Sequence, residues 1–366
     1  FQPLTREGLA RALGKPVPPD RHHPSTTAGG VISNPDDLET AATDKDRPLV
    51  LDRVVACFPF AQIKRTSRDY VWVCNAFCFA VHLVWLVLCL RSSAGKADKM
   101  KVRVFRIAGT WNSTGANGYT YELVDNNMPL RIDLLCAAFF GLSMIAHGAI
   151  TFLAPFNFTR YIFWRNLDRA FSWWRWLEYS VSASIMMLGI SLLVGLREQN
   201  ALASVFILCW GTMLTGYFTE VYSHPLNDLN GWEHDDAALG RTRNSQRVLN
   251  YVRRMMPAIF GIFLYIAMWV IVLNSFLQSL DDLRRQDKEL YDKMPAFVPW
   301  AVFGTFVIFS LFTIPLLRYQ WLPPRHYWQT EIWYCLLSLT AKSFLGGLLY
   351  SFVLRAGSFE EALSPD

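Results

Sequence analysis

Seven long apolar blocks constrain this chain more than any other feature of its sequence. Each is long enough to cross ~30 Å of hydrocarbon at ~1.5 Å per residue. The chain is also only 18% charged, below the ~25% of soluble domains. The sequence therefore predicts an all-α membrane protein with seven transmembrane helices, at residues 70–90, 130–154, 170–196, 200–222, 256–280, 297–318 and 328–354.

The flanking and connecting segments differ in composition. Residues 1–50 are rich in Pro, Asp and Thr, which is typical of a disordered arm. Residues 51–69 are amphipathic and are expected to lie on the membrane surface. The seven-helix domain then covers residues 70–355, and a short tail covers 356–366.

The loops predict further local structure. Between the first two helices, KVRVFRI and YTYELV flank a turn-rich stretch, a pattern that predicts a β-hairpin. The third and fourth helices are joined by only a few residues, so they should be antiparallel neighbours. Residues 223–255 are expected to form a long polar loop that ends in basic sequence.

Orientation is predicted from Lys and Arg near the helix ends, which favour the cytoplasm. The side that carries the N-terminus holds a slight excess, so we expect a cytoplasmic N-terminus and an extracellular C-terminus. A glycosylation sequon at Asn112-Ser113-Thr114 agrees, because the first loop would then face outward.

Several function classes find no support in the residues. The seven cysteines show no CxxC pair and no Cys/His spacing, so we expect buried thiols and no metal site. The net charge of +5 is not clustered with aromatics on a soluble face, which argues against nucleic-acid binding. No catalytic residues and no enzymatic activity are predicted.

A lysine stands in the middle of the last apolar block. Lys342 is about 20 Å along the helix axis from either membrane surface, too far for its side chain to reach water. Such a lysine either pairs with a carboxylate for structure alone or, once desolvated, becomes a nucleophile that forms an imine with an aldehyde.

Glu178 is the best candidate for the negative partner of a protonated imine. We place it near mid-depth of the third helix. Arg175, one turn earlier on the same face, is expected to keep Glu178 ionised. The alternative is a self-contained Arg–Glu pair at a helix end. We interpret Glu220, in the fourth helix, as an interfacial residue.

Three further polar residues fall inside the apolar blocks. His82 and His147 lie at similar depths of the first two helices, which indicates either a polar cavity or two packed histidines. Ser338 is one turn before Lys342 on the same helix face, so its hydroxyl is within reach of the imine.

These motifs together resemble the heliorhodopsins. The resemblance rests on Arg175-Trp176-Leu177-Glu178-Tyr179-Ser180 in the third helix and on Ser338-Leu339-Thr340-Ala341-Lys342-Ser343 in the seventh. The two histidines, the hairpin loop and the cytoplasmic N-terminus agree with it. The similarity covers roughly residues 65–355.

The resemblance implies a rhodopsin bundle that binds all-trans retinal on Lys342 as a protonated Schiff base, with Glu178 as the only carboxylate counterion. It implies photoisomerisation to the 13-cis form, a slow photocycle that signals light to an unidentified downstream protein, and a homodimer in the lipid bilayer. The expected retinal pocket adds Arg175, Tyr179, Ser182, Met186, Met213, Gly216, Phe309, Phe312 and Ser338.

Two positions argue against a light-driven pump. Where a pump-like pattern has carboxylates, this chain has Ser338 and, eleven residues after Glu178, Gly189. We therefore predict that a proton released by light is held briefly by His82 or His147 and then returns. A proton pump or channel of the same fold is the alternative, and a seven-helix receptor without chromophore is the third possibility.

Overall fold

The structure is a computed structural model, and it describes residues 67–96, 98–111, 119–153, 163–164, 166–167, 170–229, 242–286, 288–292, 297–321 and 327–355. Within these ranges, seven helices are long and apolar enough to span a membrane. The seven predicted spans are thus confirmed, with ends that differ by a few residues. The spans are Arg68–Ser93, Ile132–Leu153, Trp173–Leu193, Gln199–Tyr222, Met255–Gln286, Phe297–Arg318 and Tyr327–Leu354.

Several spans are built from more than one helical element. The first, third, fourth and fifth spans lie in α4 (Ser67–Ser93), α7 (Trp173–Leu193), α8 (Gln199–Leu229) and α9 (Thr242–Gln286). In the other three, wider π-helical turns η1, η2 and η4 interrupt or extend the helix. These elements are α5 (Ile132–Gly148) with η1 (Ala149–Leu153), then α11 (Phe297–Pro299), η2 (Trp300–Gly304), α12 (Thr305–Leu311) and α13 (Thr313–Trp321), and finally α14 (Tyr327–Leu348) with η4 (Leu349–Leu354).

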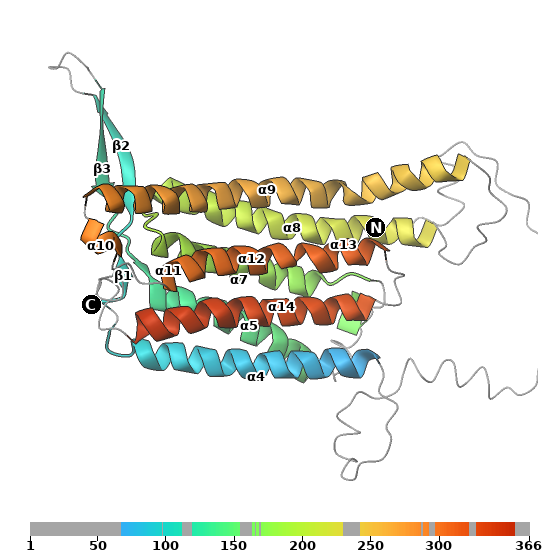
Figure 1. Cartoon of the computed structure of the whole chain (residues 1–366). Helices are drawn as coiled ribbons and strands as arrows, with labels where there is room; N and C mark the ends of the chain where they lie inside the picture. Colours follow the sequence, from blue (N-terminus) through green and yellow to red (C-terminus); the bar gives the residue numbers. More distant parts are fainter. Residues whose placement is uncertain are drawn as a thin grey trace, which may run out of the picture. The chain divides into compact units, whose positions relative to one another are not determined.

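The helices pack side by side around α7 (Figure 1). α7 is the most enclosed of the seven spans, and it packs against both α5 and α8. α4 lies between α5 and α14, and α8 lies beside α9. Tyr265 of α9 donates a hydrogen bond to the carbonyl oxygen of Phe306 in α12, which joins the fifth and sixth spans.

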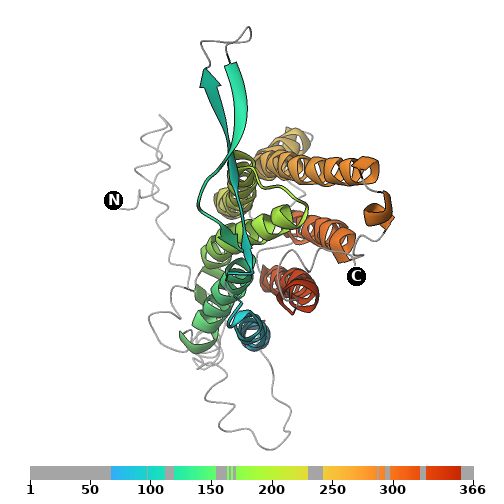
Figure 2. The same cartoon turned by 90° about the vertical axis from the view of Figure 1, so that its left-hand side faces the viewer.

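The predicted hairpin is present between the first two spans. It lies at one end of the helices and extends sideways from the bundle (Figure 2). β2 (Phe105–Trp111) pairs antiparallel with β3 (Tyr119–Asp125). A second, shorter pair, β1 (Lys101–Val102) with β4 (Leu130–Arg131), lies at its base. The hairpin's turn, which includes the sequon, is outside the described residues.

The predicted loop 223–255 is wrong in length, because α8 continues to Leu229 and α9 starts at Thr242. Hydropathy marks where the membrane ends, whereas a helix continues as long as its backbone bonds are satisfied. The predicted arm 1–50, the tail 356–366 and all but the end of the amphipathic segment lie outside the described residues; α4 already includes Ser67 to Asp69.

Candidate functional site

Lys342 is buried at the centre of the bundle with one carboxylate beside it. Its side-chain amine lies 2.6 Å from Oε1 of Glu178 in α7 and 3.0 Å from the hydroxyl oxygen of Ser338, one turn earlier in α14. Lys342 is 2% exposed and Glu178 is 9% exposed. Two opposite charges in direct contact offset much of the free energy that their removal from water costs.

Glu178 reaches Lys342 from near the start of α7. The helix begins at Trp173, later than predicted, so Glu178 is its sixth residue rather than mid-depth. Ala170, with a φ of 61°, leads into an extended segment before the helix. The 2.6 Å contact between Glu178 and Lys342 shows that the first turns of α7 and the middle of α14 lie at the same level of the bundle.

A serine that the sequence did not single out also binds Glu178. Ser143 of α5 lies 2.6 Å from Oε1 of Glu178 and 3.0 Å from the carbonyl oxygen of Phe139. A hydroxyl has one proton, and the shorter contact to a charged acceptor favours donation to the carboxylate. Ser143 therefore stabilises the ionised form of Glu178 together with Lys342.

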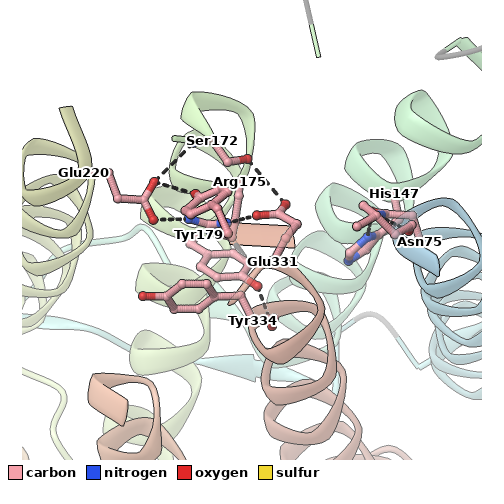
Figure 3. A network of polar contacts seen from close by, with 10 residues as sticks. Asn75, His147, Ser172, Arg175, Tyr179, Glu220, Glu331 and Tyr334 are labelled. Atoms are coloured by element: carbon pink, nitrogen blue, oxygen red, sulfur yellow. Dashed lines mark hydrogen bonds and ion pairs between the residues drawn. The ribbon is translucent and has the colours of Figure 1, made fainter. Parts of the chain in front are cut away.

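Arg175 does not perform the role predicted from the sequence. It was expected to hold Glu178 ionised, but its guanidinium group binds two other carboxylates (Figure 3). Nη2 donates to Oε1 of Glu220 in α8 at 2.5 Å, and Nη1 donates to Glu331 in α14. The spacing rule for helix faces was correct, but contacts from neighbouring helices determine where the long side chain points.

Glu220 is likewise not interfacial, because it is fully buried. Its second oxygen accepts hydrogen bonds from the hydroxyl of Tyr327 at 2.9 Å and from the backbone N–H of Ser172 at 3.1 Å. The Arg175 guanidinium also lies 4.2 Å from the centre of the Tyr334 ring. We refer to Arg175, Glu220 and Glu331 as the arginine cluster.

A cavity beside Lys342 lies between α7, α8, α12 and α14. Eight of the predicted pocket residues line it, and Ala183 and Ala341 complete the lining. The eight are Tyr179, Ser182, Met186, Met213, Phe309, Phe312, Ser338 and Lys342.

Gly216 is not among the residues that line this cavity. A Cβ atom at Gly216 would lie 2.3 Å from the ring of Trp176, so the space left by the glycine is filled by that indole. Gly216 thus leaves room for an indole of the protein itself, and not for the retinal ring that the sequence predicted there.

The two histidines lie together between α4 and α5. The rings of His82 and His147 are stacked with their centres 5.3 Å apart, and both residues are buried. Nδ1 of His82 contacts the carbonyl oxygen of Cys78 at 2.6 Å, and Nδ1 of His147 contacts Oδ1 of Asn75 at 2.8 Å. Within the described part of the chain, neither Nε2 atom has a hydrogen-bond partner.

A protein-family model matches most of the chain. The model described as Heliorhodopsin matches residues 71–354, which include all the residues of the site. The chain belongs to the heliorhodopsin family. A comparison with curated proteins finds no match. Family membership identifies this protein as a light-sensing rhodopsin of the retinal type. Its seven apolar helices make it an integral membrane protein with several spans. The family is not a classical enzyme family. Among the described residues of this heliorhodopsin, no group of three or more His, Cys, Asp and Glu side chains could hold a metal ion.

Proposed function

We propose that this protein holds all-trans retinal as a protonated Schiff base on Lys342, with Glu178 as its counterion, and that it signals light without net ion transport. The observation that carries the proposal is the 2.6 Å contact between the Lys342 amine and Glu178. The amine nitrogen stands where the imine nitrogen would be. Among the seven described spans, Lys342 is the only lysine.

The lining of the cavity suits an apolar aldehyde. Its walls are mainly apolar and aromatic, with Met186, Met213, Phe309 and Phe312 along its length and the Lys342 amine among its lining residues. Condensation of the amine with the aldehyde releases one water molecule, and the proton retained on nitrogen faces Glu178.

The protein's own groups would control that proton. Glu178 stabilises the positive charge, Ser143 donates to Glu178, and Ser338 lies beside the nitrogen. Because Arg175 binds Glu220 and Glu331, Lys342 is the one cation in contact with Glu178 within the described part of the chain. When bound, the retinal supplies photoisomerisation from the all-trans to the 13-cis form.

The histidine pair is the proposed temporary proton acceptor. If the imine lost its contact with Glu178, an imidazole beside the site could accept its proton. The free Nε2 atoms of His82 and His147 supply two acceptor positions among the described residues. A slow return of the proton would set the lifetime of the signalling state.

Two positions support signalling over transport. Ser338 and Gly189 occupy the positions where a pump would need carboxylates, and neither can carry a proton between the imine and a membrane surface. Proton pumping or conduction by the same fold is the alternative. We further propose a cytoplasmic N-terminus, an extracellular C-terminus and an unidentified cytoplasmic signalling partner.

The hairpin supports the proposed homodimer. Ile107 pairs with Leu123 on one face of the β2–β3 ribbon, and Tyr121 lies on the same face by the period of two. Ile107 is 53% exposed, and Tyr121 and Leu123 are each 72% exposed. A second copy of the chain would cover them.

The test is reconstitution of the full chain with all-trans retinal. The wild-type protein should acquire a visible absorption band, and Lys342→Ala should lose it while keeping its helical content. Lys96→Ala is the matched control, since Lys96 lies outside the spans and binds the carbonyl oxygens of Leu354 and Arg355. A visible band that persists in Lys342→Ala would refute the attachment site.

A further inference from the structure

The arginine cluster has one more acidic group than its cation can neutralise. Arg175, Glu220 and Glu331 are 5%, 0% and 1% exposed, respectively. With both carboxylates ionised, the cluster would hold a net charge of −1 inside the bundle. An unpaired buried charge is costly in a medium of low polarity, and binding a proton removes that cost.

The hydrogen bonds distinguish the two carboxylates. Glu220 accepts from three donors, namely Arg175, Tyr327 and the backbone N–H of Ser172. Glu331 accepts from Arg175 and has only a long contact of 3.4 Å with the Ser172 hydroxyl. Because donors favour the ionised form of a carboxylate, Glu220 is the better site for the negative charge.

We propose that the arginine cluster is a second proton-binding site, in which Glu331 carries a proton in the dark and Glu220 is ionised. The groups that face this site come from every element around it. They are Ser172 before α7, Arg175, Trp176 and Tyr179 of α7, Glu220 of α8, and Tyr327 and Tyr334 of α14. Arg175 is the only cation among these described groups, so one carboxylate charge balances it.

A chain of contacts links this site to the retinal cavity. Tyr179 lines the cavity and donates a 2.7 Å hydrogen bond from its hydroxyl to the carbonyl oxygen of Tyr334. The Tyr334 ring then lies under the Arg175 guanidinium. Displacement of Tyr179 by the chromophore would therefore change how Arg175 is shared between its two carboxylates. This coupling rests on the proposed function, whereas the proton on Glu331 does not.

Infrared spectroscopy of the full chain without added retinal tests the proton in the dark. The wild-type spectrum minus that of Glu331→Gln should contain the carbonyl band of one protonated carboxyl group, shifted in heavy water. Glu122→Gln, an exposed hairpin position, is the control and should remove only carboxylate bands. Absence of the carbonyl band from the wild-type minus Glu331→Gln difference overturns the proposal.

Aspartate variants locate the proton. Glu331→Asp keeps an acid and should move the carbonyl band, while Glu220→Asp should leave its position nearly unchanged. A shift that follows Glu220→Asp instead would overturn the assignment to Glu331. Both variants keep the charge that Arg175 needs, so they remain informative if Glu331→Gln does not fold.

Illumination tests the coupling separately. With retinal bound, light should shift the same carbonyl band, and Glu331→Gln should lack that shift. A carbonyl band present in the dark but unchanged by light in a coloured protein overturns the coupling alone. Failure to form pigment refutes the proposed function, and the coupling with it, but leaves the dark result standing.

Discussion

Ser143→Ala should move the acid transition of the pigment to higher pH. The Ser143 hydroxyl donates a 2.6 Å hydrogen bond to Glu178, and a bond to a charged group contributes about 1.5–3 kcal/mol. Without it, the ionised form of Glu178 loses that stabilisation, so the carboxyl group takes up a proton at higher pH. At 1.36 kcal/mol per pH unit, the midpoint should rise by roughly one to two units.

The assay is the visible absorption spectrum recorded across an acid titration. Protonation of the counterion removes the charge beside the imine, so the band should shift to the red as the pH falls. Ser191→Ala is the matched control, because Ser191 is also buried and, among the described residues, its hydroxyl donates to the carbonyl oxygen of Met187 and to no carboxylate. If Ser143→Ala titrates like Ser191→Ala, then Ser143 does not support the charge of Glu178 and the reasoning fails.

Three further outcomes are expected. Glu178→Gln should shift the remaining pigment to the red and lower the pH at which the imine loses its proton, measured by absorption titration; a wild-type titration would point to another counterion. Gly216→Ala should destabilise the protein by about 1–3 kcal/mol, because the added Cβ would overlap the Trp176 ring. The control is Gly141→Ala, where the nearest atom to the added Cβ is 3.9 Å away. Its midpoint of thermal unfolding should stay unchanged or rise. Illuminated cells should show neither a sustained pH change nor a photocurrent; an uncoupler-sensitive pH change would establish transport.

The features that the sequence predicted well are those with a strong physical signal. Spans are set by the length of apolar runs, and the hairpin by alternation around a turn. Lys342 and Glu178 could be named because an ionisable residue inside a span needs a reason. Their contact at 2.6 Å agrees with the expected pairing.

The features that the sequence did not predict depend on contacts between distant segments. Ser143 looks like any helix serine until α5 is packed against α7. Arg175 has Glu178 one turn away, yet Glu220 and Glu331 lie 45 and 156 residues further along the chain and bind it instead. A local spacing rule cannot weigh such partners against each other.

The positions of the buried charges along the chain decide when each one can meet its partner during synthesis. α7 and α8 are adjacent in the chain, so Arg175 meets Glu220 as soon as these two helices are side by side. Glu178, in contrast, has its cation on α14, the last of the described α-helices along the chain. Until then it sits in the growing bundle with no lysine to pair with. α14 itself brings one cation and one acid, Lys342 and Glu331, and each finds its partner on α7. Insertion of the final helix and completion of the site are thus a single event, which makes a chain truncated before α14 a ready target for quality control.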